Sequence, residues 1–279
     1  MFRFYTNCHL WHPTMDEWLW STRCIPNDEL QRIDRFVFQR DAKFALAGQL
    51  LIRYVLLKAY DKKSKCVFDV KRTEKGRPYV EELDGKFDFN LSHHGQLVTI
   101  GATFDGSIGC DTTEYTLPSI PKQSVEYWTR LFKNEFTNNE QNFILNDQNE
   151  SVRFKNFHRL WCLKESYVKM IGQGIGFELL RLDFNIKSLF DETDQNQIIS
   201  DTRLMIDNRF NQNVRFDEQI IYLSDNQQQI VTLCLAPTNP IEKFIELDMS
   251  DVIKSSTPIR DNFDKQLWEN HTKKKSGLS

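Results

Sequence analysis

The chain has 279 residues, of which 40% are hydrophobic and 27% are charged, a composition that supports a buried core and excludes an intrinsically disordered protein. The 36 basic and 39 acidic residues leave a formal net charge of −3, so no general positive field attracts nucleic acid or an anionic membrane. No apolar segment reaches the roughly 18 residues of a membrane span, and the N-terminus lacks the apolar core of a secretion signal. We therefore expect a cytoplasmic protein with no nucleic-acid or membrane partner.

Six cysteines are spread thinly along the chain, without a C-x-x-C pair or a framework of short spacings. This usage is typical of reduced thiols in a cytoplasmic protein and disfavours structural zinc. The cysteines are Cys8, Cys24, Cys66, Cys110, Cys162 and Cys234.

Helical spacing of apolar residues predicts a first long helix from about Arg40 to Tyr60. A lysine-rich stretch, DKKSKC, closes it. Four short β-rich segments then follow, separated by glycine-containing turns: VFDVKR, PYVEEL, KFDFNLS and LVTIGATF. In KFDFNLS the side chains of Asp88, Asn90 and Ser92 alternate with apolar ones and point to the opposite face.

Prolines in TLPSIPKQ indicate a linker, after which the pattern starts again. Helices are predicted from about Ser124 to Leu145, with a capping box of Thr137 and Glu140, and from about Phe157 to Ile171, ending at Gly172. The segment FELLRLDFNIK predicts a strand, and EQIIYLSDNQQQIVTLCLAP predicts a hairpin.

A helix followed by strands, occurring twice, predicts an α+β protein of two similar halves with a ligand cleft between them. We expect the N-terminal half to span residues 1–117 and to hold the phosphate-binding strands and cations. The C-terminal half is expected to span residues 118–240. From about Ile241 the periodicity is lost, and residues 241–279 are expected to form a mobile tail.

Four cations gather in the stretch KRTEKGRP, where glycine and proline restrict the turn beside them. Taken alone, such a run is most often a solvated charged surface. Rigid cations beside free backbone N–H groups are also what a phosphate group needs. The stretch is therefore a candidate anion site.

The segment FNLSHHG places Ser92, His93 and His94 at the end of a strand, with one imidazole on each face. A zinc site is a weak alternative here, because no third histidine or cysteine follows at ligand spacing. In IGCD, Asp111 ends a buried strand. A carboxylate there is either a turn residue or a ligand for a hard cation.

Trp161, Glu165 and Lys169 recur at helical spacing and share one helix face. An exposed Glu–Lys pair, worth about 0.3–0.5 kcal/mol, is the simpler reading of the last two, but it does not explain the glycine-rich exit GQGIG. Carboxylates from different halves, Asp111 and Glu165, together with the cation cluster predict a magnesium–diphosphate site. The sequence contains neither the Walker pattern nor G-x-G-x-x-G.

Five blocks carry a resemblance to a known family, and they extend in order from about Arg32 to Leu182. They are RFVFQRDAKFALAGQLLIR, RTEKGRP, FNLSHHG, IGCD and WCLKESYVKMIGQGIGFEL. The chain resembles the 4′-phosphopantetheinyl transferases of the broad-specificity, surfactin-synthetase-activating type, and among them the eukaryotic aminoadipate-semialdehyde dehydrogenase branch. The blocks cover just over half the chain and leave out the segment after Pro240.

The resemblance implies two α/β halves related by pseudo-two-fold symmetry, with coenzyme A as co-substrate in the cleft. It also implies that Asp111 and Glu165 bind Mg²⁺, with Mn²⁺ as an alternative, and that Lys169 contacts the diphosphate. The residues that it implies for coenzyme A binding are Arg32, Arg72, Thr73, Glu74, Lys75, Gly76, Arg77, Asn90, Leu91, Ser92 and His93, together with Asp111, Glu165 and Lys169.

One position departs from the family pattern. Many bacterial members carry a second carboxylate two residues after the aspartate of IGCD, where this chain has Thr113. Water, His94 or Glu114 would then complete the metal shell. We favour water or His94, because alternation along a strand turns Glu114 to the other face.

The expected function is Mg²⁺-dependent transfer of 4′-phosphopantetheine from coenzyme A to a serine of an apo carrier protein, releasing 3′,5′-ADP. Glu165, Lys169 and His93 are the expected catalytic residues. A coenzyme A-binding regulatory protein without transferase activity and a metal-dependent phosphoesterase are the alternatives. Expected partners are carrier domains of the fatty acid synthase or aminoadipate reductase or dehydrogenase type, bound by a monomer. Candidate contacts for an acidic carrier surface are Arg40, Lys43, Arg53 and Lys58.

Overall fold

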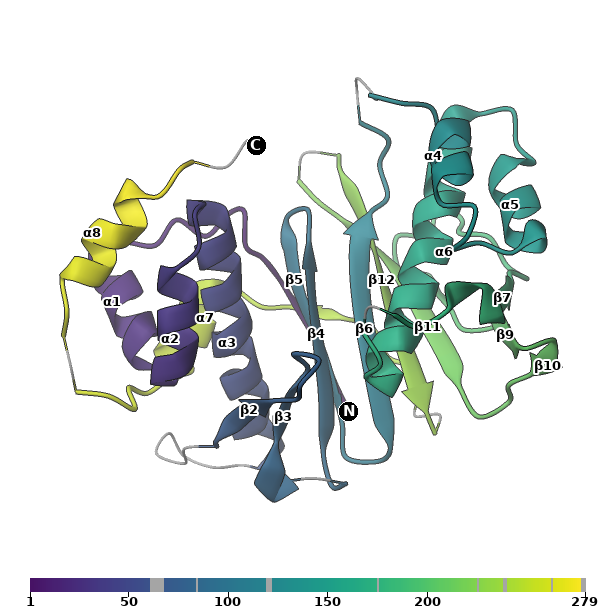
Figure 1. Cartoon of the computed structure of the whole chain (residues 1–279). Helices are drawn as coiled ribbons and strands as arrows, with labels where there is room; N and C mark the ends of the chain where they lie inside the picture. The colour runs from purple at the N-terminus through teal and green to yellow at the C-terminus, as the bar shows by residue number, and fades with distance from the viewer. Residues whose placement is uncertain are drawn as a thin grey trace.

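A computed structural model of the chain describes residues 1–60, 68–83, 85–118, 122–174, 176–224, 226–237, 240–261 and 263–276. Helices and strands are mixed throughout these ranges (Figure 1), which confirms the α+β class. The predicted stretch DKKSKC lies outside the described residues. Within the ranges given, no helix combines the length and the apolar character that crossing a membrane requires.

The N-terminal half packs a long helix against an antiparallel sheet. Its elements are β1 (Phe2–Asn7), α1 (Met15–Arg23), α2 (Asn27–Asp34), α3 (Gln39–Ala59), β2 (Val70–Arg72), β3 (Pro78–Val80), the 3₁₀ turn η1 (Glu81–Leu83), β4 (Asp88–His94) and β5 (Leu97–Thr103). In the sheet, β5 pairs with β1 on one side and with β4 on the other. The long helix α3 confirms the predicted helix to within one residue at each end, whereas α1 and α2 add to the predicted elements.

The C-terminal half repeats the pairing of a long helix with an antiparallel sheet. Its elements are β6 (Ser107–Glu114), α4 (Val125–Leu131), α5 (Asn138–Leu145), α6 (Glu150–Ile171), η2 (Leu179–Arg181), β7 (Leu182–Asn185), β8 (Ile198–Ile199), β9 (Arg203–Ile206), β10 (Arg209–Phe210), β11 (Arg215–Tyr222) and β12 (Gln228–Ala236). The sheet has the order β6-β12-β11-β8, and the predicted hairpin is confirmed as β11 and β12. Helix α6 packs on β6 and β12.

The predicted helix over residues 124–145 is two helices, α4 and α5. The Thr137 hydroxyl accepts the Glu140 amide, and the Glu140 carboxylate accepts the Thr137 amide. This reciprocal pair confirms the capping box and begins a new helix at Asn138. A capping box marks an N-terminus, which explains why the pattern breaks there.

The two sheets meet where β4 lies beside β6 (Figure 1). Polar side chains of β4 satisfy backbone amides of β6: the Asp88 carboxylate accepts from Ile108 N at 2.9 Å, and Asn90 Oδ1 accepts from Cys110 N at 2.8 Å. The polar face predicted for KFDFNLS therefore faces the other half. Because β6 hydrogen-bonds to β12, the division between the halves falls before β6, which differs from the expected boundary at 117.

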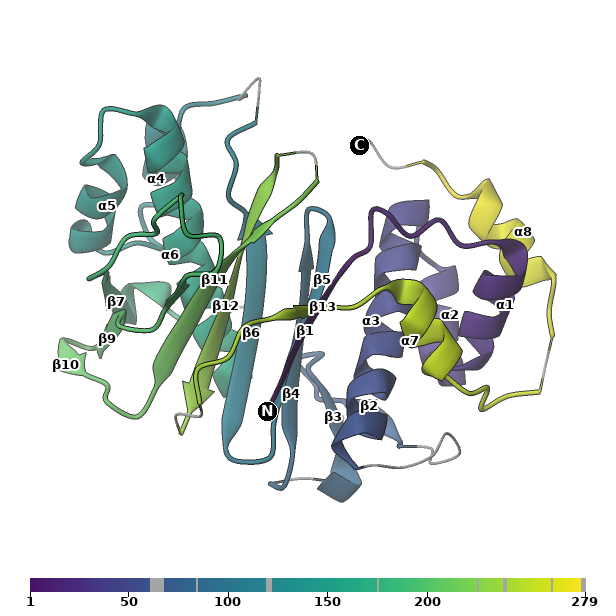
Figure 2. The ribbon, with the colours of Figure 1, turned by 180° about the vertical axis from the view of Figure 1, so that it is seen from behind.

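The segment expected to be a mobile tail is instead packed on the N-terminal half. Its elements are β13 (Ile245–Glu246), α7 (Met249–Ser255) and α8 (Gln266–Lys273). Strand β13 pairs with β1 in parallel, and Figure 2 shows this segment passing in front of β1 on its way to α7. Met249, Val252 and Ile253 are buried in the same apolar cluster as α3. These elements are too short to produce a sustained apolar period.

The described cysteines are buried and free, as expected for reduced thiols. Burial raises the pKa of Cys8 to about 12 and that of Cys24 to about 11, against partial opposition from nearby cations. Cys66 lies outside the described residues. These thiols therefore remain protonated near neutral pH and contribute to the core as small apolar groups.

Candidate active site

A cavity of about 610 Å³ lies between α3, the RTEKGRP turn, β4 and the end of α6. This volume is within the range of pockets for small molecules. We call it the cationic pocket, because arginine and lysine side chains from separate segments line it. Its lining includes the predicted residues Arg32, Arg72, Lys75, Gly76, Arg77, Asn90, Leu91, His93 and Lys169.

Thr73 and Glu74, which belong to the stretch RTEKGRP, are not among the residues that line the cationic pocket. The hydroxyl of Thr73 accepts the amide of Arg77 at 3.1 Å, and the carbonyl of Thr73 accepts the amide of Gly76. Gly76 has a φ of +82°, a conformation that glycine adopts without strain. Thr73 therefore closes the turn that presents the neighbouring cations.

A second cavity adjoins the first, and we call it the acidic pocket. Ser92, Asp111 and Glu165 line it, while His93 and Lys169 line both cavities. The acidic pocket draws on both halves, since Ser92 lies on β4 and Glu165 lies on α6. Both carboxylates that the sequence singles out face one space, beside the lysine at the junction of the pockets. They lie in the C-terminal half on β6 and α6, and not in different halves as expected.

Lys169 is held at this junction by the strand residues. Its ammonium lies 2.6 Å from Asp111 Oδ1 and 2.8 Å from Ser92 Oγ, and the Ser92 hydroxyl donates to the same Asp111 oxygen at 2.9 Å. Burial alone would lower the pKa of Lys169, but the Asp111 carboxylate outweighs it and raises that pKa. Lys169 is therefore a fixed positive charge at neutral pH.

Glu165 lies one turn before Lys169 on α6 and is partly buried. Burial raises its pKa, the negative charge of Asp111 raises it further, and Lys169 opposes both. Two carboxylates that repel across one cavity fit a divalent cation placed between them, because the cation would relieve the repulsion. Among the described residues, no group of three or more His, Cys, Asp or Glu side chains could hold a metal, so water would supply the remaining ligands.

The two histidines after Ser92 have different environments. Partial removal from water, followed by the charge of Lys169, lowers the pKa of His93. The Nδ1 atom of His94 accepts the amide of Glu114 at 3.1 Å, which places its proton on Nε2 and leaves no free nitrogen lone pair for a metal. Glu114 lines a different cavity, with Arg40 and Gly95. For a metal held by Asp111 and Glu165, water would therefore be the favoured third ligand.

His158 also lines the acidic pocket and was not predicted. It lies seven residues before Glu165 on the same face of α6, so the helical spacing could have indicated His158 as a site residue. Thr113, at the position of the second bacterial carboxylate, lies 3.2 Å from His158 Nδ1. Burial, and then the charge of His94, lowers the pKa of His158 to about 3, so its ring is neutral at physiological pH.

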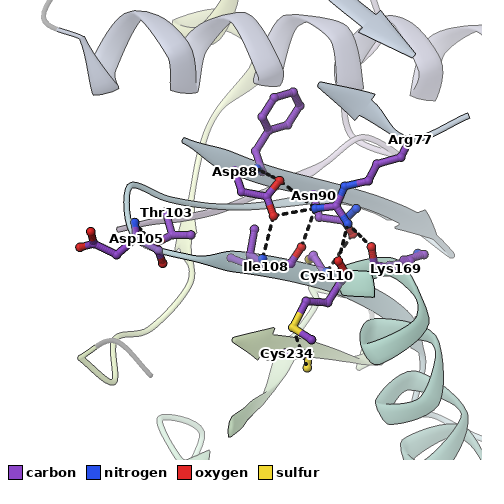
Figure 3. Close-up of polar contacts among 11 residues, drawn as sticks. Arg77, Asp88, Asn90, Thr103, Asp105, Ile108, Cys110, Lys169 and Cys234 are labelled. Atoms are coloured by element: carbon purple, nitrogen blue, oxygen red, sulfur yellow. Dashed lines mark hydrogen bonds and ion pairs between the residues drawn. The ribbon is translucent and has the colours of Figure 1, made fainter. Parts of the chain in front are cut away.

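Arg77 is engaged by protein groups rather than free (Figure 3). Its guanidinium donates to the carbonyls of Lys169, Met170 and Ile108 and to both oxygens of Asp88. The first two carbonyls end α6, where cations stabilise the helix dipole. Arg77 therefore fastens the end of α6, and with it Lys169, to β4 and β6.

The glycines that follow α6 are explained by their backbone conformation. Gly172 is the left-handed cap of the helix, with a φ of +66°, and Gly174 has a φ of +59°. Both line the cationic pocket. The left-handed backbone at Gly172 and Gly174 directs the chain away from α6 along the cavity wall. Residues with a Cβ would be strained in this conformation.

The cations expected to face a carrier protein differ in exposure. Arg40 and Lys58 are exposed. Lys43 is partly buried, and its ammonium donates a hydrogen bond to the carbonyl of Trp11. Arg53 is only 5% exposed and reaches the carbonyl of Thr257. Arg53 is therefore inside the fold and cannot contact a partner, because the C-terminal segment that was expected to be mobile covers it.

The fold and the site together define an α+β protein whose halves bring acidic and basic groups to adjoining pockets. A family model described as 4′-phosphopantetheinyl transferase, N-terminal, matches residues 9–105, and one described as 4′-phosphopantetheinyl transferase superfamily matches residues 107–234. The chain belongs to the 4′-phosphopantetheinyl transferase superfamily and is a transferase enzyme. The boundary between the two matches agrees with the division before β6.

Two named relatives cover nearly the whole chain, and a third covers about half of it. An L-aminoadipate-semialdehyde dehydrogenase-phosphopantetheinyl transferase of Xenopus laevis is 32% identical, over 98% of this chain and 92% of the relative. The human protein of that name is 30% identical, over 96% of this chain and 89% of the relative. A 4′-phosphopantetheinyl transferase of Bacillus pumilus, psf-1, is 31% identical, over 52% of this chain and 57% of the relative.

Proposed function

We propose that the protein transfers 4′-phosphopantetheine from coenzyme A to a serine of an apo carrier protein and releases 3′,5′-ADP. The observation that carries the proposal is the junction of the two pockets, where Lys169 meets Asp111 at 2.6 Å beside Glu165. The cationic pocket suits the anionic coenzyme, and the acidic pocket opens beside it for the incoming hydroxyl.

Asp111 and Glu165 would hold a magnesium ion, or manganese in its place, with water completing the shell. When bound, the ion would neutralise negative charge on the diphosphate. Hard divalent cations of this kind take one or two carboxylates together with substrate phosphates. The donor set of the acidic pocket fits this preference.

The chain's own side chains account for the remaining chemistry. The serine oxygen of the carrier forms a bond to the phosphorus that bears pantetheine, and the bond from that phosphorus to the bridging oxygen breaks. The Lys169 ammonium and His93, which border both pockets, stabilise charge that builds on the diphosphate oxygens. Glu165 accepts the serine proton at its carboxylate, directly or through a water molecule.

The expected partners are carrier domains of the fatty acid synthase or aminoadipate reductase or dehydrogenase type. The names of the relatives support the second type. We expect the enzyme to act as a cytoplasmic monomer, since one chain contributes both walls of the acidic pocket.

Release of 3′,5′-ADP from coenzyme A tests the proposal against its alternatives. The reaction is followed with Mg²⁺, in the presence and absence of an apo carrier protein. Release that requires the carrier supports a transferase, whereas equal release without the carrier indicates a phosphoesterase. Binding of coenzyme A without any release indicates a regulatory protein.

A further inference from the structure

Glu29 is a buried carboxylate in the first turn of α2, and nothing in the predicted site includes it. Its side chain is 4% exposed. One oxygen, Oε2, accepts from Arg32 Nε at 2.9 Å and lies 2.7 Å from Arg32 Nη2, while the other, Oε1, accepts from Arg72 Nε. A single carboxylate thus holds two arginines that come from a helix and from the end of a strand.

Both arginines line the cationic pocket, with side chains 40% and 34% exposed for Arg32 and Arg72. Arg72 Nη1 also donates to the carbonyl of Gly76 at 2.9 Å. Within the described part of the chain, Arg32 Nη1 and Arg72 Nη2 have no hydrogen-bond partner. Glu29 therefore occupies the Nε edge of each guanidinium group and leaves one terminal nitrogen of each for a ligand.

Two guanidinium groups placed side by side repel each other, and each long side chain loses rotamer freedom when it is held in one geometry. The Glu29 carboxylate offsets both effects, because it neutralises one charge and fixes both planes. The Arg32–Arg72 pair with Glu29 keeps a net charge of +1, and Lys75 on the same pocket adds another. An anion that enters meets donors already in place, so it loses less entropy on binding.

We propose that Glu29 is a positioning residue that preforms the Arg32–Arg72 pair as a seat for an anionic group of coenzyme A. The proposal rests on the proposed function for the identity of the ligand. It adds a residue that does not contact the ligand itself. Its effect should therefore appear in the affinity for coenzyme A and leave the transfer step unchanged.

The test is Glu29→Gln, which keeps the shape of the side chain and removes its charge, with Asp28→Asn as the matched control. Asp28 lies in the same turn of α2 and is exposed. The Kd for coenzyme A is measured by calorimetry on the full chain without a carrier, and KM and kcat are measured with one. We expect Glu29→Gln to raise Kd and KM together by roughly 10- to 100-fold, the range known for removing a residue that supports a ligating side chain at a metal site. We expect kcat at saturating coenzyme A to stay within about twofold of wild type.

A wild-type Kd in Glu29→Gln, a loss of kcat at unchanged KM, or an equal loss of affinity in Asp28→Asn would overturn the role of Glu29. If Glu29→Gln melts below the assay temperature, Glu29→Asp replaces it. The aspartate withdraws the carboxylate by one methylene, so we expect a smaller rise in Kd, and a wild-type Kd there overturns the proposal. The proposed function fails separately, when the wild-type chain binds coenzyme A but modifies no carrier.

Discussion

Lys169 and Asp111 form an ion pair within the C-terminal half, with Lys169 Nζ 2.6 Å from Asp111 Oδ1. The lysine comes from the last turn of α6 and the aspartate from β6, and Asp111 is much the more buried of the two side chains. The pair places a fixed positive charge beside two carboxylates. The Lys169 ammonium can therefore stabilise negative charge that develops on a diphosphate oxygen.

Replacing Lys169 should reduce transfer far more than it reduces stability. Lys169→Met keeps most of the length of the side chain and removes its charge. We expect kcat to fall by roughly 10²- to 10³-fold, the usual effect of losing one charge-stabilising donor. Lys155→Met, on the same helix and lining neither pocket, should retain wild-type kcat. Steady-state kinetics with an apo carrier protein measure both, and near-normal turnover in Lys169→Met would refute the role of the lysine.

Replacing Glu165 should separate activity from stability. Burial and the charge of Asp111 raise the pKa of Glu165, so its ionised form destabilises the folded state, and this penalty disappears as pH falls through the raised pKa. Glu165→Gln removes the penalty. We expect no transfer and an unchanged or higher melting temperature at pH 7.5, with a smaller difference from wild type near pH 5. A lower melting temperature at pH 7.5 would contradict the electrostatic account.

Sequence reasoning could propose the candidate site residues that lie within one local pattern. Glu165 and Lys169 share a helix face, so the local period was sufficient for them, whereas Asp111 was expected at a strand end and lies within β6. Glu29 was missed because its role exists only after α2 packs beside a turn 43 residues away. Arg77 lines the cationic pocket, and its guanidinium also fastens α6 to β4, a tertiary arrangement that no spacing reveals.

The C-terminal segment should contribute to stability, and this contradicts its expected mobility. Ile253 on α7 is 7% exposed within the N-terminal core, whereas Lys254 beside it has a side chain that is 74% exposed. We expect Ile253→Ala to lower the free energy of unfolding by about 2–5 kcal/mol and Lys254→Ala to change it by less than about 0.5 kcal/mol. Urea denaturation measures both, and equal effects would show that α7 does not belong to the core.

A histidine on α8 should make folding sensitive to acid. His271 stacks on Trp18 with ring centroids 3.6 Å apart, and burial lowers its pKa to about 4. An unfolded histidine titrates near 6.5, so the stabilisation is complete above that value and is lost as pH falls toward 4. The loss should reach roughly 3 kcal/mol.

The free energy of unfolding, measured from pH 7.5 to pH 4.5, tests this prediction. His271→Gln should have a shallower decline than wild type, because one titrating group is removed. His12→Gln, at an exposed histidine, should follow the wild-type curve. Parallel curves for His271→Gln and wild type would mean that His271 does not carry the acid sensitivity.

The mass of an apo carrier protein after incubation with coenzyme A and Mg²⁺ tests most directly whether Asp111 and Glu165 form a transfer site. The wild-type chain should add one phosphopantetheine group to the carrier serine, while Asp111→Asn and Glu165→Gln, folded as judged by thermal melting, should add none at equal enzyme concentration. A full mass gain with both variants would contradict the account, because transfer would then proceed without the two carboxylates.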